Sequence, residues 1–185
     1  MTLRSGTGRL IAVVGPSGVG KDSVMAGIHA TAPNFHLVRR VITRAPDLGG
    51  EDYDAATVPQ FNEMVVHGAF AVHWGAHGLF YGIPTTVKYQ LNKGTDCLVN
   101  FSRSALPQAA ELFDHLLVLN ITADREVLAR RLAARGRENA GDIAKRLAQS
   151  EKPLPTGLNV IHLPNNGPLT DTVSRAVALL QPASV

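Results

Sequence analysis

The chain has few of the residues that mark secreted, membrane-spanning or fibrous proteins. Its single cysteine, Cys97, cannot form a disulfide within the chain, which excludes a small disulfide-stabilised scaffold. The apolar run near the N-terminus covers only residues 10–14, too short for a signal-peptide core or a membrane span. No repeat or low-complexity run is visible. We therefore expect one cytoplasmic globular domain over residues 1–185, with Cys97 as a small buried hydrophobic residue rather than a reactive thiol.

Aromatic residues are also scarce, at 5% of the chain, and none lies in its most basic segment. That segment, residues 125–152, holds eight of the 18 Lys and Arg residues against four acidic residues. Such basic helices form a solvated face, bind nucleic acid or clamp phosphates. Without aromatic residues the segment offers no platform for stacking bases, so we expect no nucleic-acid partner. The phosphate clamp agrees best with the motifs that follow.

Apolar segments alternate with segments of helical spacing along the whole chain. We expect strands at residues 10–14, 37–43, 70–74, 79–81, 96–101, 116–121 and 158–163. We expect helices at 21–32, 59–67, 84–92, 104–113, 124–134, 140–149 and 168–180, with Thr122 as a candidate cap. This alternation predicts an α/β domain with a mainly parallel sheet. Residues 35–90 contain more loops and shorter strands, including an expected loop at 44–57, and indicate an inserted acceptor-binding subdomain.

Seven residues between the first strand and the first helix match the Walker A pattern. They are Gly15, Pro16, Ser17, Gly18, Val19, Gly20 and Lys21. The glycines let successive backbone N–H groups face one anion, and the helix N-terminus adds partial positive charge. Lys21 is placed to bridge the β- and γ-phosphates of ATP and to neutralise charge during transfer. The motif predicts a three-layer P-loop NTPase fold with ATP as phosphoryl donor.

Asp22 occupies the eighth motif position, where Ser or Thr usually places a hydroxyl on Mg²⁺. A carboxylate is a good ligand for Mg²⁺, so Asp22 is a candidate metal ligand, directly or through water. The alternative is that Asp22 only stabilises the first helical turn, while Ser23 or water serves the metal. We favour the metal role.

Three short segments in the inserted region resemble the acceptor-binding region of guanylate kinases. They read R-A-P from Arg44, G-E-D-Y to Tyr53 and F-Y-G around Tyr81. The resemblance implies that Arg44, Tyr53 and Tyr81 hold the phosphate of the acceptor. Their chemistry agrees, because a guanidinium fork matches phosphate oxygens and phenol hydroxyls add neutral donors. A surface arginine and two packing tyrosines would be the plainer interpretation.

A basic segment at residues 132–147 resembles the arginine-bearing lid of the same family, which we expect at about 124–150. Arg135 and Arg146 match its two transfer-site arginines. The resemblance implies that they close over ATP, exclude water and stabilise charge on the moving phosphoryl group, with Arg137 assisting at the nucleotide. Charged helices without any ligand would look similar in sequence.

The residues with which guanylate kinases read guanine are missing from this chain. His73 stands where that family has a glutamate, Arg40 where it has a serine, and Asn100 near the place of an acid. Loss of a buried carboxylate that pairs with the N–H groups of guanine should abolish selectivity for guanine. The acceptor is therefore expected to differ from GMP.

These departures form a pattern of their own. The stretches G-P-S-G-V-G-K-D, I-T-R, H-G-L-F-Y-G, L-V-N-F-S-R and R-G-R-E-N resemble the ribose 1,5-bisphosphate phosphokinase family. The resemblance runs from about residue 10 to residue 166. It implies ATP and Mg²⁺ as cofactors, a phosphorylated sugar as acceptor, 5-phosphoribosyl 1-diphosphate as product and an association with phosphonate breakdown.

The same resemblance implies that Arg40, His73, His77 and Asn100 line a pocket for a sugar bisphosphate, with a second anion near Arg40 or Arg103. For the two histidines, a packed or merely hydrogen-bonded role is equally open. Two other functions also remain open, a nucleoside monophosphate kinase of altered base specificity and a non-catalytic guanylate-kinase-like binding module. Whether the protein is a monomer or a homodimer is not decided by the sequence.

Overall fold

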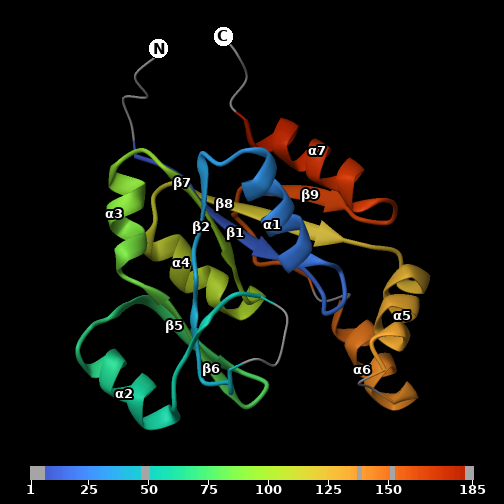
Figure 1. Ribbon diagram of the computed structural model, residues 1–185, viewed down its shortest axis with the longest axis horizontal. Coiled ribbons are helices and arrows are strands. Elements are labelled where there is room, and N and C mark those ends of the chain that lie inside the picture. Colours follow the sequence, from blue (N-terminus) through green and yellow to red (C-terminus); the bar gives the residue numbers. More distant parts are fainter. Residues whose placement is uncertain (1–6, 47–50, 137–138, 151–152, 182–185) are drawn as a thin grey trace.

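The computed structural model describes residues 7–46, 51–136, 139–150 and 153–181. Its centre is a five-stranded sheet whose neighbouring strands all run parallel (Figure 1). The strand order is β2 (Phe35–Leu37), β7 (Asp96–Asn100), β1 (Leu10–Val14), β8 (Leu116–Thr122) and β9 (Val160–Pro164). The parallel α/β sheet expected from the sequence is confirmed.

Helices cover both faces of this sheet and complete the three layers. On one face lie α1 (Lys21–Thr31), α5 (Arg125–Ala134), α6 (Ala140–Ser150) and α7 (Leu169–Leu180); on the other lie α3 (Thr86–Asn92), η1 (Arg103–Ala105) and α4 (Leu106–Leu112). Along β1, Ile11 and Val13 belong to the first core, whereas Leu10, Ala12 and Val14 belong to the second. Burial on both faces explains why this strand is apolar without alternation.

A second sheet of four strands lies beside the first and carries the inserted region (Figure 1). Its order is β4 (Asp54–Ala55), β3 (Val41–Ile42), β6 (Leu79–Pro84) and β5 (Phe70–Ala76), and α2 (Val58–Val66) precedes β5. β5 and β6 form a hairpin whose turn holds His77 at φ 53° and Gly78 at φ 75°. Two consecutive positive φ values are typical of the tight turns that match strand twist.

Three local expectations were wrong. Residues 37–43 do not form one strand: β2 belongs to the parallel sheet and β3 to the second sheet, because the chain changes sheets between them. The expected loop at 44–57 contains β4, which pairs parallel to β3. Thr122 does not cap α5, since it pairs with Pro164 in the sheet, and Asp124 occupies the cap position.

Cys97 lies in β7, fully buried. Burial raises the pKa of its thiol to about 12, and the carboxylate of Asp96 adds to this effect. The thiol is therefore protonated and unreactive near neutral pH, as the sequence suggested. Among the described residues, no helix has the length and apolar character needed to cross a membrane.

Candidate active site

The phosphate loop joins β1 to α1 and is packed closely against elements far away in sequence. Gly18 and Gly20 have φ values of 85° and 95°, which L side chains rarely adopt. A Cβ at Gly18 would approach Leu132 to 3.0 Å, and one at Gly20 would approach Nδ2 of Asn165 to 2.9 Å. Both glycines are thus required by conformation and by space, as the Walker A pattern predicts.

A buried polar network holds this loop from behind. Nδ2 of Asn165 donates to the carbonyl of Val19 at 2.8 Å, and Oγ1 of Thr172 donates to Oδ1 of Asn165 at 2.8 Å. Both side chains are buried, so loss of either would leave unpaired polar atoms. The sequence interpretation missed them, because an Asn-Asn-Gly stretch looks like any surface turn. Asn165 thereby holds the peptide group of Val19 within the phosphate loop.

Lys21 begins α1 and bends back over the loop. Its Nζ donates to the carbonyls of Gly15 at 2.9 Å and Pro16 at 3.4 Å. Burial lowers the pKa of Lys21 from 10.5 to about 8. Among neighbouring charges, Asp22 opposes this shift and Arg40 adds to it. The ammonium is therefore poorly solvated in the free protein and gains from a phosphate partner.

A test of this pKa is the proton balance of ATP binding. The phosphates of ATP favour the charged form of Lys21, so binding above pH 8 should take up close to one proton at this group, and ATP affinity should fall as pH rises further. Calorimetry at pH 8.5 in buffers of different ionisation enthalpy measures this uptake. Lys21→Arg, which stays charged at that pH, should lower the uptake; equal uptake in both proteins would contradict the assignment.

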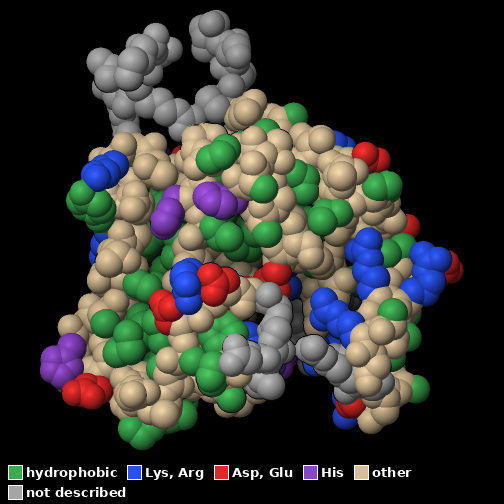
Figure 2. Space-filling model, viewed as in Figure 1, with side chains coloured by type: hydrophobic (Ala, Val, Ile, Leu, Met, Phe, Trp, Pro, Cys, Tyr) green, Lys and Arg blue, Asp and Glu red, His purple; other side chains and the backbone are tan. Residues whose placement is uncertain are grey.

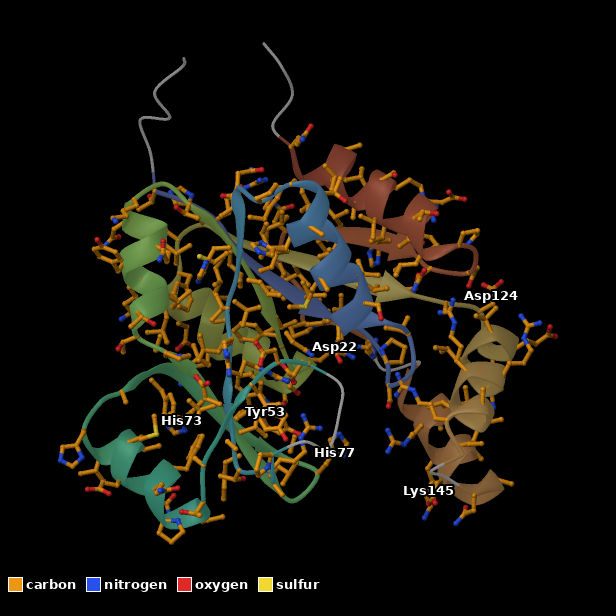
Figure 3. The ribbon with its side chains drawn as sticks, in the orientation of Figure 1. Asp22, Tyr53, His73, His77, Asp124 and Lys145 are labelled. Carbon is orange, nitrogen blue, oxygen red and sulfur yellow. The ribbon has the colours of Figure 1, made fainter. Side chains whose placement is uncertain are left out.

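Asp22 follows Lys21 and lies at the centre of the molecule, between the second sheet and α5–α6 (Figure 3). Its Oδ1 accepts a hydrogen bond from Nδ2 of Asn100 at 3.0 Å. Asn100 is buried at the carboxyl end of β7, next to β1. It therefore orients the carboxylate, in addition to the sugar-pocket role implied by the resemblance. Ser23, the alternative metal partner, is exposed.

The Asp22 carboxylate is a candidate ligand for Mg²⁺ bound together with ATP. No cluster of three or more His, Cys, Asp or Glu residues occurs in the described parts of the chain. Mg²⁺ commonly uses one or two carboxylates and completes its octahedron with phosphate oxygens and waters. An oriented Asp22 beside the phosphate loop fits that arrangement, whereas a metal site made only of protein groups does not.

Arg40 is the most enclosed cation of the acceptor region, at 5% exposure. Its Nε and Nη2 donate to the two carboxylate oxygens of Glu51. The guanidinium carbon lies 4.8 Å from the ring centre of Tyr81 and 5.6 Å from that of Trp74, and these two rings stack on each other. Because Glu51 occupies one edge of the Arg40 fork, the expected second anion meets an arginine that is already paired.

Arg44 and Tyr53 form the other part of the acceptor region. The Arg44 guanidinium lies 4.5 Å from the ring centre of Tyr53, and the Tyr53 hydroxyl donates to the carbonyl of Ala45. Nε of Arg44 is buried and has no hydrogen-bond partner among the described residues. A buried donor without an acceptor is costly, so this nitrogen favours a ligand oxygen.

The structure does not bring the two histidines into this pocket. The ring of His73 lies beside Phe61 and Phe70, at centroid distances of 6.4 and 6.3 Å. Successive residues of a strand point to opposite faces, so His73 lies away from the Trp74 side that carries Arg40. His77 is exposed in the hairpin turn (Figure 3). The placement of His73 agrees with the packed role left open above, whereas His77 is exposed in the turn.

The basic helices α5 and α6 border the phosphate loop. Lys and Arg side chains gather over them, along a hollow that separates them from the second sheet (Figure 2). Nη1 of Arg146 donates to Oγ of Ser17 in the loop. Arg135 is exposed at the end of α5, and Arg137 lies outside the described residues. The lid thus contacts the loop through one of the two arginines expected to act in transfer.

Arg103 lies on η1 and extends the same group of charges. Its charge contributes to the lowered pKa of Lys21, and burial lowers the pKa of Arg103 itself. The structure therefore gathers Lys21, Asp22, Arg40 and Arg103 into one electrostatic neighbourhood, together with Glu51. Glu51 had no role assigned from the sequence, although it stands in the G-E-D-Y stretch that was recognised.

The fold and the site define a P-loop phosphotransferase with a separate acceptor region and a basic lid. The sequence model of the guanylate kinase family matches residues 7–163. Relatives called ribose 1,5-bisphosphate phosphokinase PhnN, from Ruegeria sp. (strain TM1040) and Agrobacterium fabrum (strain C58), are 49% and 45% identical. These alignments cover 94% and 93% of this chain and 92% and 96% of the relatives. The chain therefore belongs to the guanylate kinase family, within its ribose 1,5-bisphosphate phosphokinase branch.

Solved structures support the fold independently. A guanylate kinase from Anaplasma phagocytophilum superposes with a TM-score of 0.67 at 21% identity, over 95% of this chain and 85% of that one. At this identity the likeness concerns the fold alone. It confirms the guanylate-kinase-like architecture that the motifs implied.

Proposed function

We propose that the protein transfers the γ-phosphoryl group of ATP to the 1-phosphate of ribose 1,5-bisphosphate, giving ADP and 5-phosphoribosyl 1-diphosphate. The observation that carries this proposal is the near full-length match, at 49% identity, to a relative named for that activity. The buried, unpartnered Nε of Arg44 supports a phosphorylated acceptor. The acceptor is a small phosphorylated sugar. The reaction is a step of phosphonate breakdown, the process with which this family is associated.

The reaction needs positioning and charge stabilisation more than proton transfer. An oxygen of the acceptor phosphate forms a bond to the γ-phosphorus, while the bond to the β–γ bridging oxygen breaks and ADP leaves with the electron pair. Because the attacking oxygen is already anionic, no strong general base is required. Lys21 and the loop N–H groups hold the donor, Arg44 with Tyr53 and Tyr81 holds the acceptor, and Arg135 and Arg146 stabilise the transferred group. Arg137 assists at the nucleotide.

Mg²⁺, when bound with ATP, neutralises charge on the β- and γ-phosphates. Asp22 would hold it, oriented by Asn100 at 3.0 Å. We expect Asp22→Ala to raise the Mg²⁺ concentration for half-maximal rate about tenfold, and Asp22→Ser to recover part of the loss. Magnesium titrations of both variants measure this effect, with Asp124→Ala as the control, because Asp124 makes no side-chain cap bond. Unchanged magnesium dependence in both Asp22 variants would leave only the helix-start role.

An acceptor screen with purified protein, ATP and Mg²⁺ tests the proposed function directly. We expect product with ribose 1,5-bisphosphate and little with GMP under matched conditions, measured as kcat/KM. A higher kcat/KM with GMP would establish a nucleoside monophosphate kinase, the second candidate that the guanylate kinase match allows. No turnover with any phosphorylated acceptor would point to a non-catalytic binding module.

The role of Arg44 can be tested in the same assay. Arg44→Ala removes the buried donor beside Tyr53, so kcat/KM for the acceptor should fall about a hundredfold while the Kd for ATP stays within about threefold. Arg175→Ala is a matched control, because Arg175 is an exposed arginine on α7, outside the acceptor region, where it donates to the carbonyl of Pro164. Equal losses for ATP and acceptor would contradict an acceptor role.

A further inference from the structure

Glu51 is a partly buried carboxylate paired with a buried arginine at the acceptor region. Its side chain is 14% exposed, and that of its partner Arg40 is 6% exposed. The pair sits on the stacked rings of Trp74 and Tyr81, and Trp74 stacks in turn on Phe101, 5.4 Å away between ring centres. A buried ion pair is expensive in desolvation, so stability alone does not account for it.

The position of Glu51 relates it to the reacting phosphates. Its charge acts on Lys21, together with Arg40 and Arg103, which places the carboxylate within electrostatic range of the phosphate loop. β3, which follows Arg40, pairs with β6, the strand that carries Tyr81. Glu51 therefore belongs to the group of charges around Lys21 and, through Arg40, lies near the strand that carries Tyr81.

Glu51 supplies charged hydrogen-bond acceptor positions next to the cations of the acceptor region, in addition to the neutral oxygens of Tyr81 and Asn100. Lys21, Arg40 and Arg44 can only donate, whereas a sugar hydroxyl must also donate its own hydrogen. Of the two carboxylates acting on Lys21, Asp22 is held by Asn100 at the proposed metal position. A carboxylate has about four acceptor positions, and Glu51 uses two of them for hydrogen bonds from Arg40. The remaining positions can accept hydrogen bonds from a ligand.

We propose that Glu51 accepts hydrogen bonds from the vicinal 2- and 3-hydroxyls of the acceptor's ribose, so that Arg40 and Glu51 together form a sugar subsite. This inference rests on the proposed function and makes it more specific. Arg40 holds the carboxylate in place, and the aromatic stack holds Arg40. The subsite recognises the cis-diol of a ribose. An acceptor without a nucleobase can be recognised by this diol, whereas a nucleotide can also be recognised by its base.

The test compares ribose 1,5-bisphosphate with 2-deoxyribose 1,5-bisphosphate as acceptors for the full chain. We expect the unaltered protein to favour the ribose compound at least tenfold in kcat/KM, because a site built to bond a hydroxyl rejects the analogue without it. Glu51→Gln should lower kcat/KM for ribose 1,5-bisphosphate about ten- to hundredfold and lower it by a clearly smaller factor for the deoxy compound, which keeps only the 3-hydroxyl contact. Asp52→Asn is the control: its side chain is 73% exposed and paired with Arg39, so both values should stay unchanged.

Two results would overturn the inference, and a third would overturn the proposed function. Equal losses for both sugars in Glu51→Gln would mean that Glu51 acts only by positioning Arg40. If Glu51→Gln melts early, Glu51→Asp keeps the charge but withdraws the carboxylate by one methylene, and an unchanged sugar preference there would also refute it. If the unaltered protein uses neither sugar, the proposed function itself is overturned. In that case, calorimetry with both sugars, on the unaltered protein and on Glu51→Gln, still decides whether Glu51 contacts the diol.

Discussion

Lys21→Ala is expected to lower turnover by about two orders of magnitude or more while the protein stays folded. The ammonium lies over the carbonyls of Gly15 and Pro16, where the β- and γ-phosphates of a nucleotide on this loop would meet it. Its charge is used mostly in the transition state, when negative charge builds on the bridging oxygen, so kcat should fall more than ATP affinity.

The measurement is a steady-state assay combined with thermal melting. Burial already disfavours the charged form of Lys21, which the lowered pKa of about 8 reflects, so the variant should melt no earlier than the unaltered protein. Lys88→Ala, an exposed lysine on α3, serves as the control and should retain full activity. A Lys21→Ala protein that keeps more than about a third of its activity would exclude this lysine from the site.

Arg146→Ala should have the second largest effect, with turnover falling about a hundred- to a thousandfold. In this structure the side chain donates to Ser17, so α6 contacts the phosphate loop. An arginine that contacts the transferred phosphoryl group stabilises the transition state most, because negative charge is then spread over the phosphoryl oxygens. ATP affinity should change far less than turnover, and Arg135→Ala should follow the same pattern.

Lys145→Ala is the matched control, because Lys145 is an exposed cation beside Arg146 on the same helix (Figure 3). Arg146→Lys should recover only a small part of the rate, since an ammonium cannot match two phosphate oxygens at once. Equal losses in ATP binding and turnover for Arg146→Ala would make this arginine a ground-state anchor. The two quantities are separable by equilibrium titration and single-turnover kinetics.

The sequence by itself determined the phosphate loop, the helices and most of the strands, because their signals are local. A five-residue apolar run, a glycine-rich loop and a helix beginning at Lys21 follow one another within about twenty residues. Their conformations depend on φ preferences and on hydrogen bonds to near neighbours. The places of Lys21 and Asp22 were therefore predictable from the sequence.

The partners of the site residues were decided only by the tertiary structure. Asn165 reaches Val19 across 146 positions of the chain, and Arg40, which meets Glu51, lies where the chain passes from β2 in the parallel sheet to β3 in the second sheet. His73 faces α2 because strand residues alternate between faces, so a shift of one position decides which side chain lines the pocket. Such contacts arise from packing between distant segments, and no local pattern in the sequence carries that information.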